Sequence, residues 1–351
     1  MTAPLRSLTE KADGRRFFLQ PGFLRLVLAF LVVVQHFSRF DFGGWAVSVF
    51  FVLSGYWVSR MFTEKYVHAR RPWWTFIESR YLRLFPVYAV CLIVAAVAFS
   101  VWHILPDYVG RPFWWIRTLA FVGTIGQGQI VGPFWSLDIE FQFYLLAPAV
   151  VLFAKRLTAR STLALGAALA AFTIYCCLSG ISDLTRPTQK WVAYYSGFFF
   201  AGVAIHRLNY QPSAKHAGVS FAMLIIGAAA AVAFPATRGI FLWGYDAKLL
   251  ALNPAVSAVG AFVALPFVAF VLSKRSSAQD LHFGNFSYAL YCFHFVPWRI
   301  YYSVYGSLPS RERIGPLSLS LITVLVGSLV VYWLVDRPCE SFRKRFTGSR
   351  T

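Results

Sequence analysis

The stretch FLRLVLAFLVVVQHF, residues 23–37, is apolar over almost its whole length and has the composition of a membrane-spanning helix. Two positions break this pattern: Arg25 lies near the beginning of the stretch and His36 lies near its end. A charged side chain at the centre of a bilayer costs at least about 2.5 kcal/mol on insertion scales. The presence of two ionisable groups in one spanning helix therefore needs an explanation from the rest of the chain.

The composition of the whole chain also indicates a membrane protein. Of its 351 residues, 58% are hydrophobic and only 13% are charged, whereas a soluble domain has about 25% charged residues. Ten apolar stretches each approach the ~20 residues that cross a bilayer as a helix. They lie at residues 20–38, 44–61, 83–102, 135–154, 162–179, 191–206, 217–235, 254–273, 284–304 and 315–335. We therefore predict an all-α, polytopic integral membrane protein with one transmembrane domain over residues 1–351.

The basic charge has a topological explanation. A formal net charge of +19 would suit a nucleic-acid-binding protein. If the segment 1–19 is cytoplasmic, however, about two thirds of the 33 Lys and Arg residues fall in predicted cytoplasmic segments, including the basic tail 337–351. This positive-inside bias predicts both termini in the cytoplasm, the lipid bilayer as a partner, and no nucleic acid. The five cysteines show no metal-binding spacing, so no metal site is predicted.

Arg25 and His36 share one face of the first predicted helix. They are eleven positions apart, which corresponds to about 16.5 Å of rise and nearly three full turns. That face should look into the bundle or a water-filled cavity rather than into lipid. Two simpler interpretations stay open: Arg25 could extend its side chain to the inner headgroups, and His36 could only hydrogen-bond a neighbouring helix.

Further ionisable residues belong to other predicted spans. Asp138 and Glu140 lie in the first turns of the helix that begins near residue 135, where the helix dipole also favours negative charge. Glu140 shares a helix face with Tyr144. It also lies at the same predicted depth as His36, so the two residues are predicted to form an acid–base pair near the outer face.

Two more clusters stand out. Arg80 and Arg83 are three positions apart at the predicted cytoplasmic end of the third helix. Paired guanidinium groups suit a phosphorylated ligand, although arginines at this level also act as topology signals. His294 lies near the middle of the ninth predicted span, with Tyr288 and Tyr291 nearby.

The link before the fourth span is irregular. Its segment 113–122 is too short to cross a bilayer, so we expect an interfacial or re-entrant piece. The glycine-rich segment GTIGQGQIVGPF, residues 123–134, follows. Its glycine density predicts irregular backbone, and we interpret it as a connection in preference to a lid over a substrate.

Six short motifs follow one another along the chain. They are Arg25 and His36 with ten residues between them, FFVLSG at 50–55, RYLR at 80–83, WSLDIEFQFY at 135–144, SYALYCFH at 287–294 and VDRP at 335–338. In this order, over nearly the whole chain, they resemble the bacterial membrane-bound acyltransferase 3 family, whose members O-acylate sugars and other cell-envelope or secreted molecules.

The resemblance implies an O-acyltransferase of the bacterial inner membrane. The donor would be cytoplasmic acyl-CoA, most often acetyl-CoA, used as a co-substrate with no permanently bound cofactor. The acceptor would be a hydroxyl group of a saccharide or glycolipid. His36 would be catalytic with Glu140 as its partner, and the donor would contact Arg25, Arg80 and Arg83. Supporting positions would be Ser54, Asp138, Tyr144, Tyr288 and His294.

Two questions stay open at the level of sequence. His36 could act as a general base or could carry the acyl group as a nucleophile, and Asp138 competes with Glu140 as its acidic partner. A second class of protein, a polytopic transporter or flippase for lipid-linked sugars, also fits buried charges and glycine-rich loops. Dependence on acyl-CoA separates the two classes.

Overall fold

The computed structural model describes residues 19–123, 128–181 and 190–348. Over these ranges the chain is helical and has no strand, apart from an isolated β-bridge between Phe40 and Leu242. The α-helices are α1 (Pro21–Phe37), α2 (Gly43–Glu64), α3 (Pro72–Val101), α4 (Trp114–Leu119), α5 (Trp135–Arg156), α6 (Ala159–Leu178), α7 (Ser196–Arg207), α8 (Ala214–Ala233), α9 (Ala247–Leu250), α10 (Asn253–Val263), α11 (Leu265–Leu272), α12 (Ala278–Phe293), α13 (Phe295–Tyr305), α14 (Ile314–Val331) and α15 (Arg337–Gly348). The predicted all-α fold is thus confirmed. Residues 1–18 of the predicted N-terminal segment and residues 349–351 of the tail lie outside the described residues.

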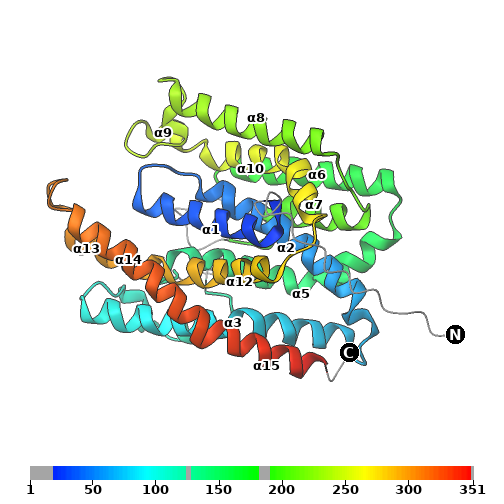
Figure 1. Ribbon diagram of the computed structural model, residues 1–351, viewed down its shortest axis with the longest axis horizontal. Helices are drawn as coiled ribbons and strands as arrows, with labels where there is room; N and C mark the ends of the chain where they lie inside the picture. The colour runs from blue at the N-terminus through cyan, green and yellow to red at the C-terminus, as the bar shows by residue number, and fades with distance from the viewer. Residues whose placement is uncertain (1–18, 124–127, 182–189, 349–351) are drawn as a thin grey trace.

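The long helices run side by side along the long axis of the molecule (Figure 1). α8 lies along one edge, α3 and α15 lie along the opposite edge, and α1, α2 and α12 lie between them. Burial follows this arrangement: 67% of the apolar window of α2 is buried inside the protein, against 11% of that of α8. α2 is therefore a core helix, whereas α8 presents most of its apolar surface outward, as a lipid-facing helix does.

Six described helices are long and apolar enough to cross a membrane, and the bent pair α10–α11 makes up to seven. The two helices of this pair are inclined by 49°, because Pro266 has no backbone N–H with which to continue the helix. Each of the ten predicted spans coincides with a helix or with two consecutive helices. α1, α7 and the pair α12–α13 are too short or too interrupted to pass the same test, so the count of ten stays a prediction.

Both ends of the described chain lie at one end of the bundle. The first turn of α1 contacts the first turn of α12 through Gly22 N–H, which donates to Asp280 Oδ2 at 2.9 Å. α15 contacts the beginning of α3 through Arg343 Nη1, which donates to Ser79 Oγ at 2.8 Å. The connection between α1 and α2 lies at the opposite end, where Asp41 N–H donates to the carbonyl of Phe241.

α2 and α7 approach each other closely because each helix places a glycine against the backbone of the other. A Cβ atom added to Gly55 would lie 2.0 Å from the carbonyl oxygen of Phe199, and one added to Gly202 would lie 2.0 Å from that of Val52. Neither position has room for a side chain. Small residues are how packed membrane helices bring their backbones together, and here they join α7 to the core helix.

Replacement of Gly202 by alanine should force α2 and α7 apart. We expect Gly202→Ala to lower the free energy of unfolding by about 1–3 kcal/mol, the usual cost of an overpacked core. Gly218→Ala in α8 is the matched control, because a Cβ there meets nothing within 4 Å. It should be neutral or stabilising. Thermal unfolding in detergent measures both, and equal unfolding temperatures for the two variants would contradict the packing described here.

Candidate active site

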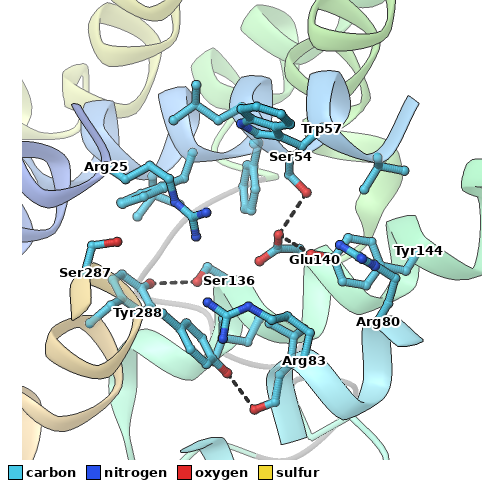
Figure 2. A pocket seen from close by; sticks show the side chains of 18 residues that line it. Arg25, Ser54, Trp57, Arg80, Arg83, Ser136, Glu140, Tyr144, Ser287 and Tyr288 are labelled. Atoms are coloured by element: carbon cyan, nitrogen blue, oxygen red, sulfur yellow. Dashed lines mark hydrogen bonds between the residues drawn. The ribbon is translucent and has the colours of Figure 1, made fainter. Parts of the chain in front are cut away.

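A polar pocket lies among α1, α2, α3, α5 and α12 (Figure 2). It encloses about 840 Å³ of empty space, including open solvent at its mouth. Its polar and charged lining consists of Arg25, Ser54, Arg80, Arg83, Ser136, Glu140, Tyr144, Ser287, Tyr288 and Tyr291. Seven of the ten residues predicted for the site are in this set, and the three others, His36, Asp138 and His294, are not. The helices thus bring together most of the site that the sequence predicted.

Helix direction orders the lining along the pocket. α1, α3 and α12 run away from the end of the bundle that holds α15, whereas α2 and α5 run toward it. Arg80 and Tyr144 therefore lie nearer the α15 end, and Phe50, Ser136 and Tyr291 lie nearer the opposite end. Arg80 and Arg83 make the pocket basic near the α15 end, whereas the described lining at the opposite end is uncharged.

Arg83 is held from two sides. Its Nη1 donates to Asp336 Oδ1, and its Nη2 donates to Asn285 Oδ1 at 3.2 Å. Asp336 is 2% exposed and ends η7 (Tyr332–Asp336), one turn of π-helix between α14 and α15. π-helical turns are rare and are frequently found at functional sites. This turn brings a carboxylate from the end of the last apolar helix to the arginine.

Arg25 points from α1 into the pocket (Figure 2). Among the described residues its guanidinium group has no hydrogen-bond or ion-pair partner. Glu140 and Asp336 attract it through space, and Arg83 repels it. Because the helix around it is apolar, this charge depends on the pocket for solvation.

Arg80 is buried and interacts mainly with aromatic rings. Its guanidinium carbon lies 6.0 Å from the ring centroid of Tyr66 and 5.7 Å from that of Phe76. Its Nη2 donates to the sulfur of Met61 at 3.5 Å. No carboxylate pairs with Arg80 within the described ranges. The sequence had predicted Arg80 and Arg83 at the end of their helix. Because α3 begins at Pro72, they lie instead two to three turns inside it.

The pocket carries an excess of positive charge. Three guanidinium groups, on Arg25, Arg80 and Arg83, face two carboxylates, on Glu140 and Asp336. A buried charge without a partner is costly, so an anionic ligand would stabilise this arrangement. Guanidinium groups are also well matched to phosphate in geometry.

Glu140 forms a compact polar cluster with two hydroxyl groups (Figure 2). Ser54 Oγ donates to Glu140 Oε1 at 2.8 Å, and the Tyr144 hydroxyl donates to the same oxygen at 2.5 Å. Oε2 accepts no hydrogen bond from the described residues. The predicted shared face of Glu140 and Tyr144 is confirmed, and Ser54 joins them from α2.

The predicted pairing of Glu140 with His36 is wrong in this structure. The prediction assumed that α5 begins at the outer surface, so that Glu140 would lie at the depth of His36. Instead α5 follows the 3₁₀ turn η4 (Gly132–Phe134), in which Phe134 is fully buried. α5 thus begins inside the protein. Glu140 consequently lines the pocket with Arg25, and His36 does not.

His36 belongs to a separate aromatic cluster. Its ring centroid lies 5.2 Å from that of His294, 5.4 Å from Phe295 and 4.9 Å from Trp298. His294 Nδ1 lies 2.8 Å from the carbonyl oxygen of Tyr291. Because a carbonyl only accepts, Nδ1 carries the proton and Nε2 is left as an acceptor. Nε2 is buried without a partner in the described part of the chain.

Asp138 belongs neither to the pocket lining nor to the aromatic cluster around His36. It is fully buried, and its Oδ2 accepts a hydrogen bond from Gln129 Nε2 at 2.8 Å. Gln129 belongs to the glycine-rich segment, whose residues 128–134 pack into the bundle, as a connection does; residues 124–127 lie outside the described ranges. Asp138 therefore anchors this segment, and neither predicted acid contacts His36.

Three residues in or beside the pocket were not predicted from the sequence. Asp336 and Asn285 bind Arg83, and Ser136 lines the pocket with Tyr291. A carboxylate directly after an apolar helix is a usable signal for Asp336. For Ser136 no such signal exists, because it is neutral and its partner Tyr291 lies 155 positions away.

The fold and the pocket define a polytopic helical protein with membrane-length apolar helices and a cationic interior. A family model described as an acyltransferase domain matches residues 19–336. The chain therefore belongs to the acyltransferase 3 family, and the resemblance found in its motifs is confirmed. Membership makes it an acyltransferase by class.

The chain is also similar to one relative over part of its length. The chain is 28% identical over 144 residues to the peptidoglycan O-acetyltransferase of Listeria monocytogenes. This match covers 36% of the chain and 23% of that protein, so the chain spans about a quarter of its relative's length. No solved structure matches the chain.

Loss of Asp336 should destabilise the protein through Arg83. Removal of one partner of a buried ion pair typically costs about 3–5 kcal/mol, because the other charge stays buried. We expect Asp336→Ala to show this loss in thermal unfolding, and Asp336→Ala with Arg83→Leu to recover part of it. Glu64→Ala is the control, since Glu64 pairs with Arg60 on an exposed surface. Additive effects in the double variant would contradict a direct coupling.

Proposed function

We propose that this protein moves an acyl group, most simply acetyl, from cytoplasmic acyl-CoA to a hydroxyl group of a cell-envelope or exported saccharide. The observation that carries the proposal is the convergence of Arg25, Arg80 and Arg83 on one pocket in an acyltransferase-family chain. Acyl-CoA carries several phosphates at one end and a thioester at the other. A pocket that is basic at one end and uncharged at the other suits such a molecule.

The donor is proposed to enter from the α15 end. Its phosphates would meet Arg80, Arg83 and Arg25, and its acyl end would point toward Tyr291 and His36. Glu140, held by Ser54 and Tyr144, would orient Arg25 across the pocket instead of pairing with His36. This assignment keeps Glu140 in the site and changes its predicted role.

The proposed topology places the α15 end in the cytoplasm of a bacterial inner membrane. The excess of Lys and Arg in the segments predicted to be cytoplasmic supports this orientation. The common location of both described chain ends also supports it. Ten spans with cytoplasmic termini remain the proposed arrangement.

His36 is the proposed catalytic residue. The acceptor hydroxyl oxygen attacks the thioester carbonyl, the carbon–sulfur bond breaks, and coenzyme A leaves as its thiol. As a general base, His36 would take the proton of the hydroxyl group and return it to the departing sulfur. As a nucleophile, it would hold the acyl group between two transfers. The ring of His294 packs beside that of His36 and would help to hold it in place in either role.

A saccharide acceptor is proposed from the family and from the name of the Listeria relative. Peptidoglycan fragments are therefore the first acceptor to test. Transport of a lipid-linked sugar is the competing function. Protein that binds no acyl-CoA but moves such a sugar across a vesicle would support transport and overturn the transferase proposal.

Arg25→Ala should weaken acyl-CoA binding. Loss of a charge-assisted hydrogen bond corresponds to about a tenfold to hundredfold loss of affinity. Lysine should restore it only in part, because it lacks the planar fork of arginine. The measurement is calorimetry of acetyl-CoA binding in detergent.

The matched control for this experiment is Arg299→Ala. Arg299 also belongs to a predicted span but lies in α13, outside the pocket lining. Its replacement should leave the affinity for acetyl-CoA unchanged. If Arg25→Ala and Arg299→Ala bind acetyl-CoA as tightly as the wild type, the donor does not use this pocket.

His36→Ala should separate binding from turnover. Because His36 lies outside the pocket lining, acetyl-CoA affinity should stay nearly unchanged while acyl transfer falls by about 10²–10⁴-fold. Mass spectrometry of O-acyl groups on envelope saccharides measures transfer in cells that accumulate the protein. His216→Ala, at an exposed position of α8, is the control and should retain activity. A His36→Ala protein with more than about a tenth of wild-type transfer would remove His36 from the chemistry.

A further inference from the structure

A layer of three side chains closes the pocket at the end away from Arg80. Phe50 of α2, Ser136 of α5 and Tyr291 of α12 line the pocket there. The Tyr291 hydroxyl and Ser136 Oγ are 2.6 Å apart, and both lie within hydrogen-bonding distance of the carbonyl oxygen of Pro133, at 3.0 and 3.1 Å. The ring of Phe50 meets Tyr291 edge-on with centroids 6.1 Å apart.

This layer separates the pocket from His36. The ring of Tyr291 lies 6.0 Å from that of His294, which in turn lies 5.2 Å from His36. On the side of His36, the ring of Phe295 packs against Gly132, where an added Cβ would lie 3.0 Å from it. Tyr291 thus contacts both the pocket and the His294 ring that packs against His36.

The layer is also closely packed around Tyr291. Tyr291 is 6% exposed, its hydroxyl is held by Ser136 and Pro133, and its ring is held by Phe50. Displacing it would break a hydrogen-bond cluster in an apolar interior, where water offers no replacement partner. The space beside such a closely packed layer can hold a small acyl group, but each methylene added to the acyl chain needs additional space.

We propose that Phe50 and Tyr291 form the wall that sets the acyl-chain length of the donor. This inference rests on the proposed function, in which the phosphates of acyl-CoA lie at the arginines and the acyl end faces this layer. Short acyl groups fit below the wall, and longer ones collide with the ring of Phe50. The two residues therefore determine specificity and need not contribute to chemistry.

The test compares acetyl-CoA with hexanoyl-CoA binding to purified protein in detergent. The wild type should bind acetyl-CoA more tightly. In Phe50→Ala, the ratio of hexanoyl-CoA to acetyl-CoA affinity should rise by about tenfold or more, since even one methylene is worth about that much in a fitted pocket. Phe50→Leu should shift the ratio in the same direction and protects the test against a misfolded alanine variant. Tyr291→Phe, which loosens the wall without enlarging it, should shift the ratio less.

Phe198→Ala is the matched control. Phe198 is 1% exposed and stacks on Phe262, outside the pocket lining. It tests whether any large-to-small change in the core alters donor preference, and it should leave the ratio at the wild-type value. If both donors bind and the ratio is the same in wild type, Phe50→Ala and Phe50→Leu, this proposal is overturned and the proposed function stands. If neither donor binds the wild-type protein, the proposed function fails and this proposal fails with it.

Discussion

Burial of guanidinium groups in an apolar bundle is the constraint on which the rest of the structure depends. Arg83 satisfies it with Asp336 and Asn285, which come from two other helices. The last apolar helix must therefore end in the π-helical turn that presents Asp336, and α15 must then return along α3. Arg25 and Arg80 lack such carboxylate partners among the described residues, and their charge is left facing the pocket. The same physics thus positions the C-terminal helices and creates an anion site.

The core helix α2 connects stability to the site. Its Gly55 faces α7 at backbone contact, while the neighbouring Ser54 reaches Glu140 across the pocket. Successive residues point about 100° apart on a helix, so one short segment both packs the bundle and lines the cavity. The adjacent Ser54 and Gly55 of the FFVLSG motif meet these two requirements: the glycine allows close packing, and the serine supplies a hydroxyl group to the pocket.

In the proposed reaction, donor and catalytic residue occupy neighbouring compartments. The arginines and Glu140 line the pocket, and His36 lies with His294 beyond the layer of Phe50, Ser136 and Tyr291. Such a division would keep the thioester in the pocket, away from bulk water. It also accounts for the length of the Arg25–His36 spacing, because about 16.5 Å of helix spans both compartments.

Helical periodicity and hydropathy are local properties. From them the sequence alone predicted the all-α fold, the grouping of Arg80 with Arg83, and the contact of Glu140 with Tyr144. The ordered motifs also indicated the family that the comparison confirmed. The depth of each polar side chain in the bundle, and its partners on other helices, were decided only by the tertiary structure. Glu140 joins Ser54 and not His36, because the buried turn η4 starts α5 inside the protein. Arg83 meets Asp336 from 253 positions away. Contacts between helices depend on where each helix begins and how it packs, and no periodicity within one helix contains that information.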